Sequence, residues 1–423
     1  MTPGQPTDVF DHIRPGANVV VGPGVGEPDT ILEAIDDRPG GWDGVRMHQM
    51  LAIKPRRFHA GEVPGIRHVS YFLSGTTRTA YRAGTCDLVP NNFSDVPRIL
   101  RQTVRPDLVI ASVSPPDRHG YFSLGCVAAY MASFIGEVPF FVEVNEQMPR
   151  TFGANQLHMS DVVGWCTTSR PLPEMPAAPT DERDRTIAGL VAERIENGST
   201  LQVGIGGVPD LVLAGLRDHK DLGVHTELMG TGIVDLVEAG VITGTRKATH
   251  RNKIVTTAAH GTQRLYDFVA DNPGVEFHPV EYTNDPWIIA REPHMVSINA
   301  SLEVDFLGQC ASESIGSQYL SSSGGQGDFA RGAVASQHGA AFIVLHSTAR
   351  DDEVSRIVPQ LSAGAAVTTY KNIVDHVVTE YGVAELRGVP IADRARRLIA
   401  IAHPKFRDAL AEQARQLGFL PRD

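Results

Sequence analysis

The feature that most constrains the fold is a pattern of strand, glycine-rich turn and helix that occurs twice along the chain. The first copy reads GANVVVGPGVGEPDTILEAI, and the second copy, in the other half of the chain, reads GSTLQVGIGGVPDLVLAGL. Gly22 and Gly24 of the first copy align with Gly204 and Gly206 of the second, and the Pro-Asp pairs align with one residue of slack. Each copy predicts a buried strand followed by a helix that is entered through Pro-Asp. The repetition favours a chain built from two related α/β halves.

A proline-rich segment separates the two halves. RPLPEMPAAPTDER, residues 170–183, has four prolines and no periodic apolar pattern, which is typical of an extended connector. The next segment predicts a helix, with Gly198 suited to its end and with one apolar face formed by Ile187, Leu190, Val191 and Ile195. Because 423 residues are too many for one comfortable core, we expect two domains, residues 1–180 and 181–423.

Further apolar runs predict buried parallel strands, and they lie at residues 107–114, 139–145, 341–347 and 375–382. Helical patterns lie between several of them, including PIADRARRLIAIAH and PKFRDALAEQARQLG near the C-terminus. Alternating strands and helices predict an α/β fold with mostly parallel sheets, which bind ligands at the carboxyl ends of their strands. The loops after Val21, Val203 and Val224 are therefore expected on the ligand-binding edges of their sheets.

Composition and charge exclude several function classes. The formal net charge of -11 argues against nucleic-acid binding as the main function, because phosphate contacts need clustered Lys and Arg. No apolar run approaches the roughly 18 residues that span a bilayer, and the N-terminus lacks the pattern of a secretory signal. The four cysteines have no CxxC spacing, which fits a reducing compartment. We therefore expect a soluble, cytoplasmic protein that does not act on membranes.

Histidines and cysteines give no sign of a metal centre. None of the sixteen histidines shows HExxH or another tight ligand spacing, so we expect no metal. Packed or hydrogen-bonded roles are predicted for His225, His260, His294 and His346, and a small buried hydrophobic role is predicted for Cys310. The glycine-rich turns match neither a P-loop nor the dinucleotide fingerprint GxGxxG, which disfavours a nicotinamide-dependent oxidoreductase.

Two further stretches can carry chemistry. SSSGGQGDFARG, residues 321–332, is either a flexible surface loop or a set of backbone N–H groups that stabilise an oxyanion. HTELMGTG places Glu227 at the end of a predicted strand, where a carboxylate is either structural or a covalent nucleophile. Glu281, Glu303 and Glu380 also lie near strand ends, so spacing alone does not choose among the four glutamates.

At this point the chain resembles a known family. DLVIASVSPPDRHGYFSLG, LQVGIGGVPDLVLAGL, GVHTELMGTGIVDLVEAGVITG, GGQGDFARG, RIVPQLSAGAAVTT and VVTEYGVAELRG are similar to segments of the acetyl-CoA hydrolase/transferase family. Within this family the chain is most similar to 4-hydroxybutyrate CoA-transferases and related bacterial enzymes. The similarity runs over nearly the whole chain, and it implies two related α/β domains of the CoA-transferase type.

The resemblance also implies roles for particular residues. Glu227 would be the catalytic nucleophile, and Gly325 would supply an oxyanion-hole N–H group. The substrate and CoA contacts implied are Val203, Gly204, Ile205, Gly206, Gly324 and Gln326. Relatives often read Ser-Asp-Gly shortly after the glutamate, whereas this chain reads Gly230-Thr231-Gly232, a difference that bears on acyl or acceptor preference.

The activity implied is transfer of CoA between short-chain carboxylic acids through a covalent glutamyl-CoA thioester. Coenzyme A would be a substrate, no other cofactor would be needed, and a homodimer is the family-level expectation. An acyl-CoA hydrolase that uses the same glutamate is the alternative, since water can also take the glutamyl intermediate. A catalytically silent module that senses CoA or a metabolite is a remote third hypothesis, disfavoured by the presence of Glu227 and both glycine-rich loops.

Overall fold

The computed structural model describes residues 2–421 and divides the chain into two compact units. Unit 1 contains the chain up to Pro176 together with Glu227–Thr231 and Lys253–Asn284. Unit 2 contains Ala177–Thr226, Gly232–Asn252 and the chain from Asp285 onward. Two short segments from the second half of the sequence thus belong to unit 1. The division into domains at residue 180 stays a prediction.

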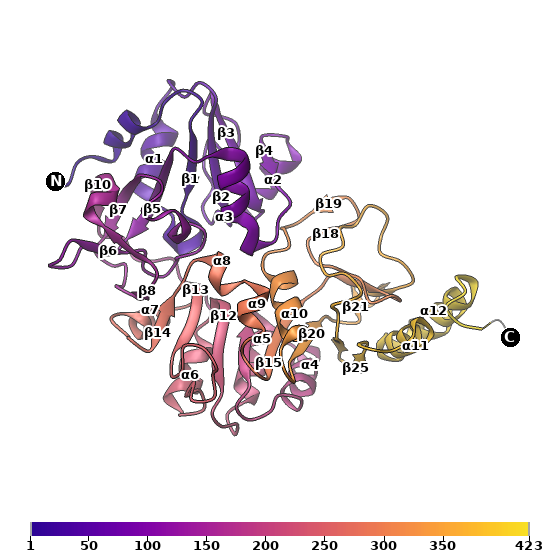
Figure 1. The fold of residues 1–423 in the computed structure, drawn as a ribbon. Helices are drawn as coiled ribbons and strands as arrows, with labels where there is room; N and C mark the ends of the chain where they lie inside the picture. The colour runs from indigo at the N-terminus through magenta and orange to yellow at the C-terminus, as the bar shows by residue number, and fades with distance from the viewer. Residues whose placement is uncertain (1, 422–423) are drawn as a thin grey trace. The chain divides into compact units, whose positions relative to one another are not determined.

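Unit 1 is organised around a parallel sheet of seven strands (Figure 1). The strands are β1 (Asn18–Val21), β2 (Val45–Met50), β3 (Ile66–Phe72), β4 (Cys86–Leu88), β5 (Leu108–Val113), β7 (Phe140–Asn145) and β10 (Val162–Thr168). Their spatial order is β10-β7-β5-β1-β2-β3-β4, and every neighbouring pair is parallel. The strand order reverses between β1 and β5, which makes the crevice at their carboxyl ends the point where sheets of this kind bind ligands.

Helices and short strands complete unit 1. The helices are α1 (Asp29–Asp37), α2 (Arg78–Arg82), α3 (Val96–Ile99), α7 (Gln263–Val269) and α8 (Val280–Thr283). Short helical segments are η1 (Pro6–His12), η2 (Gly24–Gly26), η3 (Phe93–Asp95), η4 (Leu100–Val104), η5 (Ala132–Phe134) and η6 (Met159–Asp161). The shorter strands are β6 (Tyr121–Ser123), β8 (Phe152–Gly153), β9 (Gln156–His158), β13 (Ile254–Ala259) and β14 (Val275–Phe277). Ile31 and Ile35, one turn apart on α1, pack on Val21 and Ile110 of the sheet, which fixes this helix beside the switch point.

Unit 2 has a second sheet with the same kind of reversal. Its strands are β11 (Thr200–Val203), β15 (Met295–Ala300), β20 (Ala340–Val344), β24 (His376–Thr379) and β25 (Gly382–Glu385), with the first residues of β12 (Gly223–Met229) paired to β11. The order is β25-β24-β20-β15-β11, and only β24 and β25 pair antiparallel. The crevice between the carboxyl ends of β11 and β15 is therefore the corresponding ligand position in unit 2.

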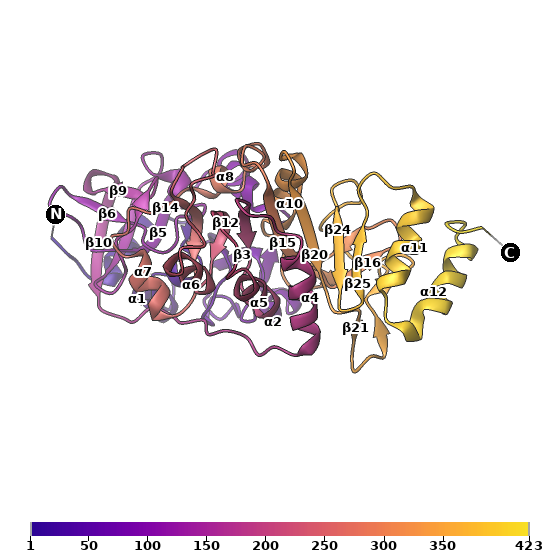
Figure 2. The same cartoon turned by 90° about the horizontal axis from the view of Figure 1, so that it is seen from below.

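Seven helices belong to unit 2: α4 (Glu182–Ala192), α5 (Gly207–Gly215), α6 (Gly232–Glu238), α9 (Pro286–Ile289), α10 (Gln326–Ala335), α11 (Ile391–Ile401) and α12 (Pro404–Gln416). Short strands β16 (Glu303–Asp305), β17 (Cys310–Ala311) and β23 (Ile357–Val358) form a small sheet. Two hairpins join β18 (Ser314–Ile315) to β19 (Gln318–Tyr319) and β21 (Thr348–Ala349) to β22 (Val354–Ser355). Figure 2 shows α11 beside β25 and α12 beyond it, where Leu398 and Leu410 bury their side chains in one apolar cluster.

The predicted α/β class with mostly parallel sheets is confirmed, and the predicted apolar runs form β5, β7, β20 and β24. Two local predictions are wrong. Helix α4, predicted to end near Gly198, ends at Ala192. Gly198 lies in a later turn, with φ of +83°, and not at the helix end. The helix of the second copy begins at Gly207, before Pro209, because proline is tolerated in a first turn whose N–H groups lack intrahelical partners. Within residues 2–421, no helix is both long and apolar enough to cross a membrane.

Unit 1 buries several histidines in neutral form, which predicts acid sensitivity. Burial lowers the pKa of His48 to about 4, of His59 to about 3 and of His260 to about 4, and it also lowers the pKa of His68 well below its usual value. An unfolded histidine titrates near pH 6.5, so below that pH the unfolded chain binds protons that the folded chain does not. Stability is therefore highest above pH 6.5 and falls toward pH 4, by roughly 1 kcal/mol per pH unit for each such histidine.

Buried carboxyl groups act in the opposite direction, since burial raises the pKa of Glu27, Asp36 and Glu143 in unit 1. Burial raises the pKa of Glu27 to about 8, so its contribution is fully present below about pH 4.5 and lost as the pH rises through 8. The four buried histidines outnumber these carboxyl groups, and we expect the melting temperature to fall between pH 7.5 and pH 5. His59→Phe, which removes one buried titrating ring, should make the fall shallower. Melting temperatures that are equal at the two pH values would contradict this prediction.

Candidate active site

Glu227 lies at the carboxyl end of β12, where the strand leaves the buried part of the sheet. Its backbone carbonyl accepts a hydrogen bond from the Thr256 hydroxyl at 3.2 Å, which fixes the strand end against β13. The Glu227 side chain is half-buried, and the residues before it in β12 are buried. The fold thus places this carboxylate at the sheet edge where the sequence predicts ligand binding.

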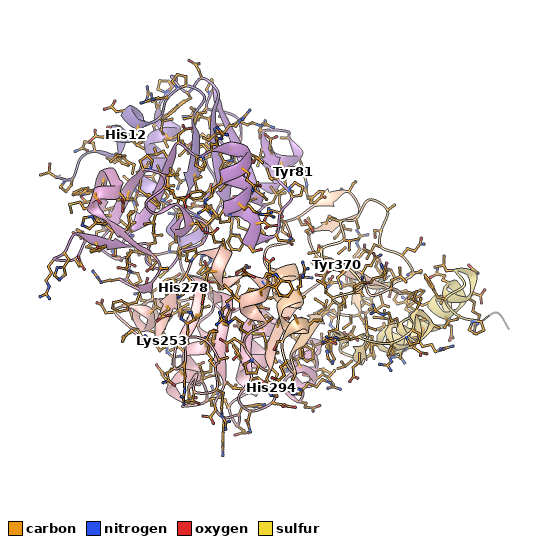
Figure 3. All side chains as sticks on the ribbon, in the orientation of Figure 1. His12, Tyr81, Lys253, His278, His294 and Tyr370 are labelled. Atoms are coloured by element: carbon orange, nitrogen blue, oxygen red, sulfur yellow. The ribbon has the colours of Figure 1, made fainter. Side chains whose placement is uncertain are left out.

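Asn284 contacts the Glu227 side chain, and no pattern in the sequence indicates this contact. Asn284 Nδ2 donates a hydrogen bond to Glu227 Oε2 at 2.6 Å. Asn284 is fully buried at the end of α8, and its own backbone N–H donates to the Val280 carbonyl at 2.9 Å. Beside it, the ring of His278 (labelled in Figure 3) packs against Tyr282 with 4.9 Å between ring centroids. Because an amide is neutral, it orients the carboxylate without cancelling the negative charge that a nucleophile needs.

The glycine-rich turn of the first copy packs close to this strand end. Gly24 has φ of +55°, and a Cβ atom added there would lie 2.3 Å from His260 Cε1, so only glycine fits. The His260 backbone N–H donates to the Met229 carbonyl at 3.0 Å, two residues beyond Glu227. His260 is buried and neutral, and its Nε2 faces the Val25 N–H at 3.5 Å. His260 therefore connects the first turn to the strand that carries Glu227.

The acidic residues in and directly after that turn, Glu27 and Asp29, form hydrogen bonds and ion pairs within unit 1. Glu27 Oε1 accepts hydrogen bonds from the Ile53 N–H at 2.7 Å and from Gln49 Nε2 at 3.1 Å, and burial raises its pKa to about 8. Asp29 forms ion pairs with Lys54 and Arg56. These contacts hold the turn in place beside the crevice at the carboxyl ends of β1 and β5.

The glycine-rich turn of the second copy, Gly204–Gly206, leaves open space beside its backbone. Val203 ends β11 and is buried, while Gly204, Ile205 and Gly206 are half-buried. Gly206 has φ of +124°, and a Cβ atom added to Gly204 or Gly206 would meet no heavy atom within 4 Å. A ligand can therefore approach the backbone of this turn, which is the property that an anion or oxyanion contact requires.

The GGQG stretch begins helix α10. Gly324 has φ of +54°, and Gly325 is the N-cap of the helix. Within the described part of the chain, no acceptor is assigned to the buried Gly325 N–H, which leaves this donor for a ligand. The Gln326 side chain donates instead to Ser312 Oγ at 2.9 Å and Thr369 Oγ1 at 3.0 Å, so its amide group anchors the loop within unit 2. Its implied substrate contact stays a prediction.

The three rival glutamates also have defined partners. Glu281 forms an ion pair with Arg101 at 2.8 Å. Glu303 accepts two hydrogen bonds of 2.8 Å from the N–H and hydroxyl of Ser362. Glu380 accepts two from Ser347, at 2.9 Å from the N–H and 2.6 Å from the hydroxyl. Each of these three carboxylates therefore takes part in contacts that join separate segments of the chain.

Thr231, where this chain differs from the Ser-Asp-Gly of its relatives, also has a structural role. The Thr231 hydroxyl accepts a hydrogen bond from the Thr262 N–H at 3.0 Å, which ties the loop after β12 to the loop after β13.

The predicted packed or hydrogen-bonded roles of the histidines are confirmed. His225 and His260 are buried, His294 pairs with Glu196 and His346 pairs with Asp184. All four cysteines are buried thiols, including Cys310, and burial raises the pKa of the Cys310 thiol.

Comparison with known proteins identifies the family. Residues 4–164 match the acetyl-CoA hydrolase/transferase N-terminal domain, and residues 261–414 match the C-terminal domain of the same family. The chain is 45% identical to succinyl-CoA:cyclohexane-1-carboxylate CoA transferase from Geobacter metallireducens, over 93% of this chain and 90% of the relative. It is 42% identical to 4-hydroxybutyrate coenzyme A transferase from Clostridium kluyveri, over 94% and 93%.

A solved structure is also similar to this chain over nearly its full length. RipA from Yersinia pestis superimposes with a TM-score of 0.94 at 36% identity, and the match covers 99% of this chain and 98% of RipA. The predicted resemblance is confirmed over nearly the full length. The chain therefore belongs to the acetyl-CoA hydrolase/transferase family, and it is an enzyme.

Proposed function

We propose that the protein is an acyl-CoA:carboxylate CoA-transferase that works through a covalent glutamyl-CoA thioester on Glu227. The observation that carries the proposal is the half-buried Glu227 carboxylate, oriented at 2.6 Å by the neutral amide of Asn284. The bacterial relatives with 45% and 42% identity are named CoA transferases, which supports the reaction class. Acetyl-CoA and 4-hydroxybutyryl-CoA represent the kind of substrate expected.

The reaction proceeds by four acyl transfers. The Glu227 carboxylate attacks the acyl-CoA carbonyl, forming a mixed anhydride and releasing the CoA thiolate. The thiolate attacks the glutamyl carbonyl of the anhydride, which gives a glutamyl-CoA thioester and frees the first carboxylic acid as its carboxylate. An acceptor carboxylate then attacks this thioester and releases the thiolate again. The thiolate finally attacks the acceptor carbonyl of the new anhydride and regenerates Glu227.

Each attack creates a tetrahedral oxyanion that needs N–H donors. The Gly325 N–H and the N–H groups of the Gly204–Gly206 turn are the donors we propose, and losing one such donor typically costs about 2.7–4 kcal/mol of activation free energy. A thioester or anhydride carbonyl is already activated toward attack, so the scheme requires no metal, and coenzyme A is a substrate rather than a resident cofactor. The first glycine-rich turn, joined to the Glu227 strand through His260, is the wall proposed for the acyl group.

The decisive experiment detects the intermediate directly. After treatment with acetyl-CoA in the absence of an acceptor, mass spectrometry of the proteolysed enzyme should show the mass of CoA on the peptide that contains Glu227. Adding acetate, butyrate or succinate should discharge the adduct and produce the matching acyl-CoA. The unlabelled peptide that contains Glu281 is the internal control, and an adduct there would contradict the assignment.

The hydrolase alternative uses the same glutamate and is separated by the same assay. A hydrolase releases CoA at a rate that acceptor carboxylates leave unchanged, and it forms no new acyl-CoA. We propose the transferase because both bacterial relatives carry that name. The homodimer remains an expectation from the family resemblance, and the cytoplasmic location remains an expectation from the sequence.

A further inference from the structure

Helix α10 is fixed in unit 2 by apolar packing along one face. A single apolar cluster buries its side chains Phe329, Ala330 and Ala333. This packing sets where the helix lies, but the direction of the Gly325 N–H also depends on the peptide that joins two glycines. Gly324 has φ of +54°, in the left-handed region that favours glycine, and a glycine backbone is the least restricted of all. The Gly325 donor therefore needs a further restraint close to it in the chain.

Gln326, the residue directly after Gly325, supplies such a restraint from a buried side chain. The residue is only 8% exposed. Its amide Nε2 donates two hydrogen bonds, to Ser312 Oγ at 2.9 Å and to Thr369 Oγ1 at 3.0 Å. Because a primary amide has two N–H donors, both donors of this side chain are used within the protein.

The two hydroxyl groups that accept these bonds come from segments that are themselves joined. The Cys310 N–H donates to the Thr369 carbonyl at 3.0 Å, and the Thr368 N–H donates to the Cys310 carbonyl at 2.8 Å. The Ser312 N–H donates to Thr368 Oγ1 at 3.0 Å. Gln326 is thus tied to a hydrogen-bonded pair of segments and not to a single loop.

Glu313 holds the other end of the serine- and glycine-rich stretch that precedes α10. The Glu313 carbonyl accepts hydrogen bonds from the Leu320 N–H at 2.7 Å and the Ser321 N–H at 3.2 Å. The buried Glu313 side chain accepts from the Thr368 hydroxyl at 2.9 Å, which connects it to the same pair of segments. The stretch 321–325 is therefore held at both of its ends by one hydrogen-bonded network.

We propose that Gln326 is a positioning residue, which holds the Gly325 N–H in the direction that an oxyanion donor requires. The proposal rests on the proposed function, in which Gly325 stabilises the tetrahedral oxyanion. It differs from the substrate contact that the family resemblance implies for Gln326, because here the amide acts through the backbone of its neighbour. A donor that is fixed in advance stabilises the transition state, so loosening it costs rate and not substrate affinity.

Gln326→Met tests the proposal, because it removes both hydrogen bonds and keeps a long unbranched side chain. We expect kcat for CoA transfer to fall about 10- to 100-fold, the loss expected for two hydrogen bonds. The KM for acetyl-CoA and the Kd for CoA, measured by calorimetry, should change less than about threefold. Gln416→Met is the control, since Gln416 is exposed on α12 and donates to Glu412 at 3.0 Å, and it should keep the wild-type kcat.

The two acceptors provide a second test. Ser312→Ala and Thr369→Val each remove one acceptor of the Gln326 amide, and each should lower kcat by about 3- to 10-fold. Because the three side chains act as one unit, adding either substitution to Gln326→Met should cause little further loss. If Gln326→Met does not fold, Ser312→Ala carries the comparison of kcat with KM, since it changes only a half-buried hydroxyl. Fully additive losses would contradict the network.

Infrared spectroscopy separates positioning from a merely structural role. In a Glu227→Gln background, the carbonyl band of ¹³C-labelled acetyl-CoA reports how strongly the bound thioester is polarised by N–H donors. We expect this band to move to lower wavenumber on binding, and to move less when Gln326→Met is added. A residue that only supports the fold would leave the band of the bound thioester unchanged.

Three results would overturn the proposal. They are a loss confined to KM or CoA binding, an unchanged kcat in folded Gln326→Met, and an unchanged carbonyl band. The first result would make Gln326 a substrate contact. Failure of the covalent scheme is recognised separately, as turnover that Glu227→Gln retains.

Discussion

Glu227→Gln is expected to reduce CoA transfer by about 10⁴-fold or more while leaving CoA binding intact. Glutamine has the same shape as glutamate and keeps a side-chain oxygen at the end of β12, but its neutral amide does not attack a thioester carbonyl. The substitution should also remove the CoA adduct seen after acetyl-CoA treatment. Steady-state rates, calorimetry with CoA and mass spectrometry of the same preparation measure the three effects.

Glu281→Gln is the matched control for this substitution. It makes the same chemical change at another glutamate of unit 1, one that is paired with Arg101 at 2.8 Å. This variant should keep activity within about threefold of the wild type, because a half-exposed ion pair near the surface contributes little to stability. If Glu227→Gln retained turnover, the covalent scheme would be refuted.

Asn284→Ala is expected to lower kcat by about 10- to 100-fold, the value of a hydrogen bond to a charged group. Asn284 is a positioning residue, because it acts on substrate through the Glu227 carboxylate that it contacts at 2.6 Å. KM for acetyl-CoA should change much less than kcat, since the amide is proposed to act through Glu227. Asn272→Ala, which removes an amide hydrogen bond to the Phe268 carbonyl elsewhere in unit 1, is the control.

Asn284→Asp separates positioning from simple destabilisation. It places a second carboxyl group beside Glu227, and two adjacent carboxyl groups do not both ionise readily. The acidic limb of the kcat profile should therefore move to higher pH in this variant, an effect that a loosened fold would not produce. An unchanged pH profile in a variant with wild-type melting temperature would argue against direct contact between the two side chains in solution.

Much of the fold followed from local sequence patterns. The apolar runs of β5 and β7 are buried strands because six consecutive residues in each face the two covered sides of a parallel sheet. The helix in the second copy of the pattern was harder to place, because its start depends on where the Gly206 backbone turns rather than on the position of proline.

The candidate site likewise depends partly on local sequence patterns and partly on contacts between segments that are far apart in the chain. The sequence placed Glu227 at a strand end but left four glutamates equivalent, and only the family resemblance chose among them. The structure adds the partners of all four glutamates, and these come from distant segments of the chain. Arg101 is 180 residues from Glu281 in the chain, and no periodicity reports such a contact.

The sequence by itself therefore determined the α/β class, the two glycine-rich turns, the position of Glu227 and the family. These features depend on residue type and short-range spacing, which directly set strand, turn and helix formation. The tertiary structure alone decided that Asn284 contacts the Glu227 carboxylate and that His260 packs against Gly24. Those contacts join residues far apart in the chain, and they exist only because the sheets and helices pack in one particular arrangement.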